Sequence, residues 1–186
     1  MQATEEKALF ERAQKSAAGF GALFDAYYDR IYAYAFRRVG ARVAAEDIAA
    51  SVFEDALRGI KRVRWQGKPM IAWLYRIAAR RVADHYRQSH QETSLESDIL
   101  MVGDGSDGAE RAEDHATVRH ALEKLSRNDR EIIRLAFFDE LGGAEIAAML
   151  NCTPNNAYVR LHRALKRLET VMQDEIERRI ASVRSR

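Results

Sequence analysis

Apolar residues recur every three or four positions through most of the chain, which is the spacing of amphipathic α-helices. One stripe predicts a helix over about residues 18–39 that stops at Gly40, and the next predicts a helix that ends at Gly59. After a basic loop, Pro69 suits the first turn of a third helix. The positions expected to be buried are Phe20, Leu23, Phe24, Tyr27, Ile31, Tyr34, Ala45, Ile48, Val52, Phe53, Ala56, Ile71, Leu74, Ala78, Val82 and either His85 or Tyr86.

The C-terminal half repeats the helical pattern in four segments. Val118, Leu122 and Leu125 share one face of the first, and Ser126 with Asp129 resembles a capping box that opens the second. Glycines 142 and 143 break that second helix, and a very short helix and the turn NCTP follow. Thr153 is a good N-cap and Pro154 a good first residue for a last helix, whose apolar stripe is Ala157, Leu161, Ala164, Leu168 and Val171.

Between the two helical halves the sequence is acidic and rich in Gly, Ser and Asp. Residues 88–115 contain eight acids against Arg111 alone, and no run of alternating β-branched residues suggests a sheet anywhere. The segment GDGSDG resembles a calcium-binding loop, but its acidic residues do not fall at the positions where such a loop needs its ligands. A flexible connector is therefore favoured. We therefore predict an all-α protein of two small helical domains joined by a flexible acidic linker. The first domain is expected over residues 16–90, the linker over 91–115, the helix-turn-helix domain over 116–172 and a C-terminal tail over 173–186.

Composition narrows the class of protein. No apolar stretch approaches the roughly 20 residues of a membrane span, and the first residues lack the apolar core of a signal peptide, so we expect a cytoplasmic protein without membrane insertion. The single cysteine, Cys152, cannot form an internal disulfide. The five histidines show no metal-ligand spacing, and phosphate-binding glycine loops and nucleophile elbows are absent. We expect no metal, no cofactor and no enzyme activity.

The net charge of +2 is the sum of segments of opposite sign. Residues 61–87 contain eight basic side chains against Asp84 alone, with Trp65, Trp73, Tyr75 and Tyr86 interleaved. Cations and aromatic rings together suit unpaired bases and their backbone, although Trp73 stands at the edge of the apolar stripe and a core position is favoured for it. The candidate DNA-binding residues here are Arg62, Arg64, Trp65, Gln66, Lys68, Arg76, Arg80, Arg81 and Arg87.

A short helix, a turn and a longer capped helix with a basic outer face form the pattern of a helix-turn-helix. Asn and Arg near the start of the last helix suit base edges, while Lys166 and Arg167 suit phosphates. An ordinary solvated helix is the alternative. The candidate duplex-binding residues are Asn155, Asn156, Tyr158, Arg160, His162, Arg163 and Lys166.

Two segments in this order resemble the extracytoplasmic-function sigma factors of bacterial RNA polymerase. They are AEDIAASVFEDAL with WLYRIAARRVADHYR, and LEKLSRNDREIIRLAFFDELGGAEIAAMLNCTPNNAYVRLHRALKRL, and the likeness extends over about residues 16–172. It implies that the first domain holds a polymerase clamp helix and captures melted minus-ten bases with the loop from Arg62 to Lys68. It also implies that the second domain reads the duplex minus-thirty-five element. The clamp-facing residues would be Asp47, Ile48, Ser51, Val52 and Phe53.

The partners that this resemblance implies are core RNA polymerase and promoter DNA, and an anti-sigma factor is common in the family. Two departures stand out: Ala50 and Ser51 replace a Gln and a Glu that commonly contact the clamp, and the recognition turn departs from the usual pattern. A stand-alone helix-turn-helix regulator that binds duplex DNA as a dimer is the alternative function, and an interaction module without promoter use is a third.

Overall fold

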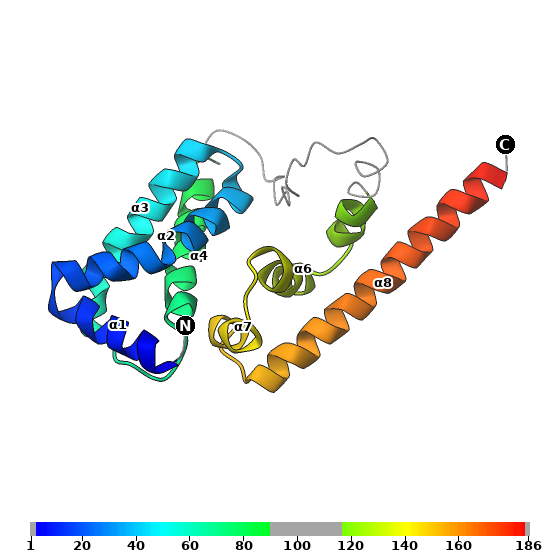
Figure 1. Ribbon diagram of the computed structural model, residues 1–186. Helices are drawn as coiled ribbons and strands as arrows, with labels where there is room; N and C mark the ends of the chain where they lie inside the picture. The colour runs from blue at the N-terminus through cyan, green and yellow to red at the C-terminus, as the bar shows by residue number, and fades with distance from the viewer. Residues whose placement is uncertain (1–2, 90–116, 185–186) are drawn as a thin grey trace. The chain divides into compact units, whose positions relative to one another are not determined.

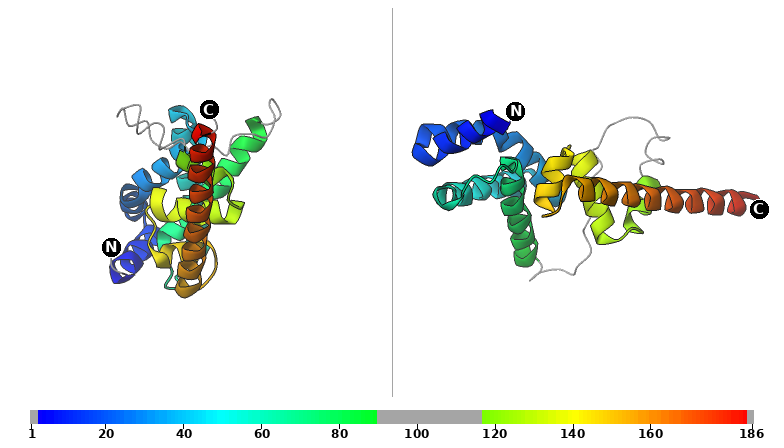
Figure 2. Two further views of the ribbon diagram at one scale, coloured as in Figure 1. Left: turned by 90° about the vertical axis from the view of Figure 1, so that its right-hand side faces the viewer. Right: turned by 90° about the horizontal axis from the view of Figure 1, so that it is seen from below.

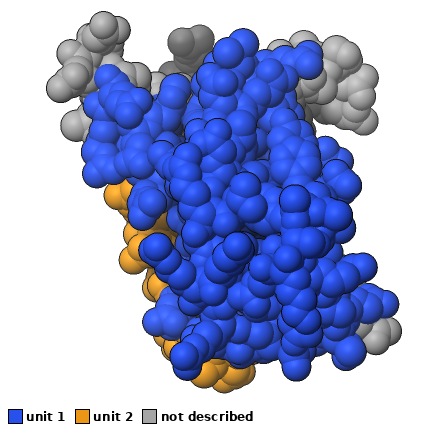
Figure 3. Space-filling model, turned by 90° about the vertical axis from the view of Figure 1, so that its left-hand side faces the viewer, with its two compact units in different colours: residues 1–101, 147–151 blue, residues 102–146, 152–186 orange. Residues whose placement is uncertain are grey.

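The computed structural model describes residues 3–89 and 117–184, so the predicted linker at 91–115 lies outside the described residues. Within those two ranges every regular element is helical, which confirms the all-α prediction. The chain divides into two compact units, one made of residues 1–101 and 147–151 and the other of residues 102–146 and 152–186 (Figure 3).

Residues 3–89, the described N-terminal part of unit 1, form four α-helices where the sequence pattern predicted three (Figure 1). The additional helix is α1, which begins before residue 16, where we had placed the start of the domain. It buries only Leu9, Phe10 and Ala13, a stripe too short to stand out among its charged residues. The elements are α1 (Ala3–Lys15), α2 (Ala17–Val39), α3 (Arg42–Gly59), the 3₁₀ turn Ile60–Arg62 and α4 (Met70–Ser89).

The core of unit 1 forms where α2, α3 and α4 pack on one another. The positions predicted there are buried except for Phe24 and the last position of the α4 stripe, where His85 and Tyr86 are both half-buried. Tyr75, which the sequence pattern grouped with base-stacking aromatics, is fully buried, and its ring centroid lies 4.8 Å from that of Tyr34. Its position beside Leu74 in the apolar stripe of α4 places it in the core, so the stacking interpretation is wrong for this residue.

The corner between α1 and α2 is tight. Ser16 caps α2 by accepting a hydrogen bond from the backbone N–H of Gly19 at 3.0 Å, and the Ser16 N–H donates to the carbonyl of Arg12 at 3.2 Å. A Cβ on Gly19 would lie 2.2 Å from the carbonyl oxygen of Arg12. Only glycine therefore lets α1 cross α2 this closely.

In the other part of the chain, a helical segment over residues 117–123 precedes α6 (Arg127–Ile133), which continues as a π-helical turn from Arg134 to Phe138. Ser126 caps α6 as predicted, accepting from the N–H of Asp129 at 3.2 Å. The helix ends before the two glycines expected to break it, and Glu140 takes a left-handed conformation at φ 52°. The short helix α7 (Gly143–Met149) follows.

The last helix, α8, runs from Pro154 to Arg184 without interruption. Both views of Figure 2 show it as one straight rod. The sequence pattern predicts a domain that ends at residue 172, followed by a separate tail, whereas α8 continues through that boundary to Arg184.

Candidate nucleic-acid interface

The turn between α7 and α8 is built as the sequence predicts. Asn151 adopts a left-handed conformation at φ 51°, and Thr153 caps α8 by accepting from the N–H of Asn156 at 3.2 Å. The helix then begins at Pro154. A short helix, this turn and a longer capped helix together form a helix-turn-helix.

Helix α8, the recognition helix of this motif, has a buried face and an exposed face. Ala157 and Ala164 are buried, and Leu161 and Leu168 are half-buried on the same side. All seven residues predicted to bind duplex DNA are exposed: Asn155, Asn156, Tyr158, Arg160, His162, Arg163 and Lys166. The face is therefore able to present amide, phenol and guanidinium groups to base edges and phosphates.

One flank of α8 forms a basic groove against the first turn of α6. The groove encloses about 700 Å³, and Arg160, Arg163 and Arg167 line its α8 side. Arg167, expected to suit a phosphate, instead donates to Asp129 through Nη1 at 2.7 Å, and the Ser126 hydroxyl donates to the same carboxylate at 2.8 Å. Arg167 thus fastens the recognition helix to the cap of α6.

In unit 1 the basic loop before α4 presents most of its side chains to solvent. Arg62, Arg64, Gln66 and Lys68 are exposed, and Gly67 takes a left-handed conformation at φ 69°. Trp65 is the exception, because it is half-buried and its ring centroid lies 5.6 Å from that of Phe10 on α1. The loop can offer four polar groups around one partly covered indole.

The arginines of α4 differ in their exposure and in the acids with which they pair. Arg76, Arg80 and Arg87 are exposed, and Arg87 forms an ion pair with Asp84. Arg81 is held inside the unit, with Nη2 2.6 Å and Nε 2.8 Å from the two carboxylate oxygens of Asp55. That hydrogen bond raises the pKa of Arg81 above its ordinary value.

Asp55 is a residue that the sequence analysis did not identify as important. Its side chain is 16% exposed and also lies 3.8 Å from Arg80 and 3.5 Å from Arg58. The Asp55 carboxylate on α3 therefore holds the guanidinium groups of Arg58, Arg80 and Arg81 close together. This carboxylate engages Nε and Nη2 of Arg81, whose side chain is 31% exposed, and so ties α4 to α3.

The five residues expected to face the polymerase do not form one surface. Asp47 is exposed and Ser51 half-buried, but Ile48, Val52 and Phe53 are 5%, 0% and 4% exposed. Those three side chains lie in the core of the unit, where they can only support α3 from its buried side. The large apolar side chains that are exposed on this helix are Val43 and Leu57, and Ala50 is exposed as well.

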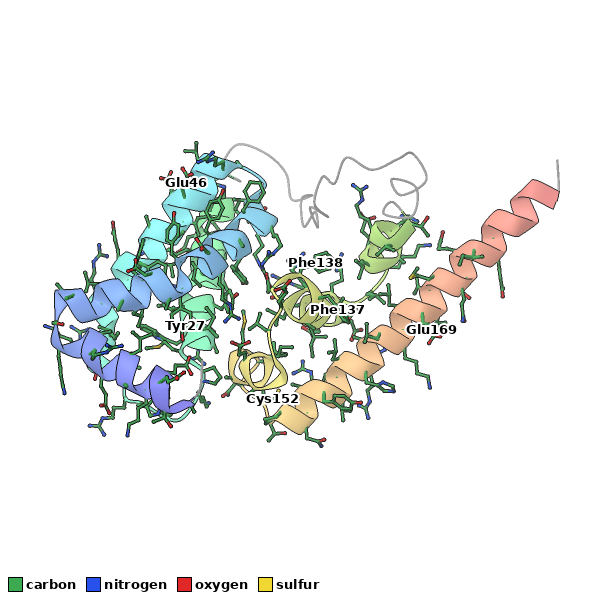
Figure 4. The ribbon with its side chains drawn as sticks, viewed as in Figure 1. Tyr27, Glu46, Phe137, Phe138, Cys152 and Glu169 are labelled. Carbon is green, nitrogen blue, oxygen red and sulfur yellow. The ribbon has the colours of Figure 1, made fainter. Side chains whose placement is uncertain are left out.

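Across the described ranges 3–89 and 117–184, no group of three or more His, Cys, Asp or Glu side chains is arranged to hold a metal ion. In the same ranges no helix is long and apolar enough to cross a membrane. Cys152, at the turn before α8 (Figure 4), is half-buried.

Comparison with known proteins gives matches to two family models. Residues 23–92 match Sigma-70 region 2, and residues 115–168 match Sigma-70, region 4. The RNA polymerase sigma factor YlaC of Bacillus subtilis is 30% identical over 156 residues, which are 81% of this chain and 90% of that protein. The ECF RNA polymerase sigma factor BldN of Streptomyces coelicolor is 31% identical over 175 residues, covering 90% of this chain and 66% of BldN.

A solved structure shares the fold. CnrH, in its complex with the cytosolic domain of CnrY, superimposes with a TM-score of 0.59 at 23% sequence identity, covering 91% of this chain and 97% of that one.

Proposed function

This chain belongs to the extracytoplasmic-function sigma factors of bacterial RNA polymerase, proteins that direct the polymerase to promoters, and we propose that it reads a two-part promoter with the surfaces described above. The observation that carries the proposal is the exposed polar face of α8, whose seven candidate residues follow a capped first turn. The chain contributes recognition and melting, while the chemistry of RNA synthesis belongs to the polymerase. It therefore acts where the DNA is, in the cytoplasm, and needs no metal or cofactor of its own.

The upstream element is read by the helix-turn-helix. Asn155 and Asn156 stand in the first turn of α8, where amide side chains can pair with adenine in the major groove. Arg160 and Arg163, about one and two turns further along α8, line the basic groove and reach toward guanine or the phosphate backbone. Lys166 adds charge without sequence preference. The proposed domain for this task is 116–172, extended by the remainder of α8.

The minus-ten element is melted by unit 1. The exposed loop residues Arg62, Arg64, Gln66 and Lys68 surround the half-buried Trp65, and we assign to this loop the capture of one unpaired base. Extruding a base costs roughly a few kcal/mol, which stacking and polar contacts offset. Arg76, Arg80 and Arg87 on α4 then follow the phosphates of the melted strand. We place the start of this domain at α1 and not at residue 16, because α1 packs on α2.

The polymerase contact is assigned to the outer side of α3. Asp47 and Ser51 are accessible there, and Val43 and Leu57 are 70% and 53% exposed. Apolar side chains beside an acid suit a protein partner. Ile48, Val52 and Phe53 hold the helix in place from the core. An anti-sigma factor is a further partner that we propose, by likeness to CnrH and its complex with CnrY.

The experiment that tests this function is run-off transcription with purified core polymerase on fragmented genomic DNA of the source organism, with and without the full chain. We expect new transcripts at discrete start sites that share a two-part upstream motif. If adding the chain to core gave no new transcripts while the chain alone shifted duplex DNA, it would be a stand-alone regulator and the proposal would fail.

A further inference from the structure

The helix that sequence patterning missed, α1, holds the promoter-melting loop by one face. Glu6, Phe10 and Gln14 are spaced four residues apart, so they form a single row along the helix. Each touches a different part of the segment from the 3₁₀ turn to the start of α4. Glu6 reaches its end, Phe10 its middle and Gln14 its beginning.

At the beginning of the loop, the side-chain amide of Gln14 donates two hydrogen bonds. They go to the carbonyl oxygens of Ile60 at 2.8 Å and Val63 at 2.9 Å. These carbonyls flank the end of the 3₁₀ turn, where the backbone leaves helical geometry. One side chain thus fixes the direction in which the loop departs from α3.

At the other end, Glu6 supplies a cap that α4 does not carry itself. The residue before α4 is Pro69, which has no side-chain oxygen to accept the first N–H groups of the helix. The Glu6 carboxylate accepts from the N–H of Met70 at 2.7 Å, and an acid at a helix N-terminus is favoured by the helix dipole. Tyr27 of α2 (Figure 4) holds the same carboxylate oxygen with a hydrogen bond of 2.7 Å.

Between these two anchors, Phe10 is 3% exposed and covers one side of Trp65. The polar loop side chains Arg64, Gln66 and Lys68 remain exposed. The backbone is therefore fastened at both ends and at its indole, while the groups that could contact a base stay available. That arrangement fits a preorganised binding loop better than a loop buried for stability alone.

We propose that Glu6, Phe10 and Gln14 are positioning residues for capture of the unpaired minus-ten base, and that α1 is part of the promoter-melting apparatus. The proposal rests on the function proposed above for the loop. Binding to a preformed loop avoids the entropy of ordering it, so loosening either anchor weakens base capture without altering any group that touches the base.

The test uses holoenzyme assembled from core polymerase and the full chain. The probe is a synthetic duplex that carries the strongest promoter mapped by run-off transcription, and a series of the same duplex with one abasic site at each non-template minus-ten position. Open-complex formation is measured by permanganate footprinting for Gln14→Ala, Glu6→Ala and Glu6→Gln. Glu11→Gln, which removes only the exposed Lys7–Glu11 pair on the same helix, is the matched control.

On the intact promoter we expect Gln14→Ala and Glu6→Ala to lower the open-complex equilibrium by about tenfold, since each removes hydrogen bonds that hold the loop. Glu6→Gln keeps an acceptor for the Met70 N–H and should recover most of that loss. On the duplex whose abasic site removes the captured base, wild type and variants should become equal. Glu11→Gln should match wild type throughout.

Two results would overturn the proposal: variants that open the intact promoter normally, or a loss of the same size on every abasic duplex. The second would mean that α1 only stabilises the fold, which the midpoint of thermal unfolding of each variant would also reveal. Wild-type holoenzyme tests the function of the loop separately. If none of the abasic sites altered open-complex formation by wild type, base capture itself would be refuted.

Discussion

At the scale of single residues, the same chemistry serves recognition in one place and support in another. Arg80 and Arg81 are neighbours in a basic helix, yet only Arg80 keeps an exposed guanidinium, because Arg81 lies against Asp55. A sequence pattern counts both as basic residues. It cannot tell them apart, because their difference depends on a carboxylate 26 positions away in the chain.

Asp55→Asn should destabilise unit 1. The substitution keeps the shape of the side chain but removes the charge that two donors of Arg81 share, and the pair is mostly shielded from solvent, with side chains 31% and 16% exposed. We expect a loss of about 1 to 2 kcal/mol in the free energy of unfolding, measured by urea denaturation.

Glu54→Gln is the matched control for that measurement. It breaks the neighbouring pair with Arg58, in which both side chains are more than half exposed. We expect a change below about 0.5 kcal/mol. Equal losses for the two variants would show that Asp55 is no more than another surface acid.

At the scale of elements, periodicity predicted α2, α3, α4 and α8 well, because each has a long stripe that its neighbours bury. It failed for α1, which buries little and is fixed instead by polar contacts with a distant loop. It also gave no sign of the π turn from Arg134 to Phe138. The labelled rings of Phe137 and Phe138 lie on that turn (Figure 4), and Phe137 is 59% exposed.

Gly19→Ala should displace α1 from α2. The new Cβ would overlap the backbone of Arg12, which cannot move as a flexible side chain could. Overpacking of this kind costs about 1 to 3 kcal/mol, more than alanine gains in a helix. Urea unfolding should therefore give a lower free energy, and limited proteolysis should cut within α1 faster than in wild type.

Gly21→Ala is the matched change on the same helix, where a Cβ would meet nothing within 4 Å. There the expected effect is neutral, or stabilising by up to about 1 kcal/mol. If both alanines stabilised the protein, the close crossing of α1 over α2 would be refuted.

The far half of α8 should be sensitive to acid. The hydrogen bond from Lys124 holds the pKa of Glu175 below the ordinary value of a glutamate. A carboxyl with a lowered pKa in the folded state stabilises that state above about pH 4.5, and the contribution disappears as the pH falls through the lowered pKa. We expect the thermal midpoint of wild type to fall more steeply than that of Glu175→Gln between about pH 4.5 and 3. Parallel pH profiles would show that this pair contributes nothing.

At the scale of the whole molecule, the proposed function makes promoter binding depend on two weak contacts joined through one polymerase. Neither the helix-turn-helix nor the melting loop needs high affinity, because the second contact forms at a high effective concentration once the first is made. Residue type and order in the sequence led to the candidate residues for DNA and for the polymerase, and their roles stay predictions. The sequence could not predict which candidates face outward: Ile48, Val52 and Phe53 are buried, and Arg81 and Arg167 are engaged by acids of their own domain.

Arg163→Ala should weaken the upstream contact alone. Its side chain is exposed on the groove of α8, and in the described part of the chain it has no ion pair with an acid. We expect weaker protection of the upstream element in a footprint and unchanged affinity for core polymerase. The slope of the logarithm of the DNA-binding constant against the logarithm of salt concentration should decrease by about one phosphate contact.

Arg119→Ala, an equally exposed arginine of the segment 117–123, serves as the control for loss of charge. It should leave the upstream footprint unchanged. An unaltered footprint for Arg163→Ala, or the same loss for both variants, would remove Arg163 from the recognition surface.

The row of contacts along α1 also constrains the order in which the unit can fold. Glu6 and Met70 are 64 positions apart, and Gln14 and Ile60 are 46 apart, so the contacts that close the row belong to large chain loops. Closing such loops costs entropy before any contact repays it, which makes them late events in folding. The ribosome makes α1 before α2, α3 and α4, yet the contacts of α1 with the loop cannot form until residue 70 has emerged. Of these four helices, the one synthesised first is therefore among the last to reach its final place.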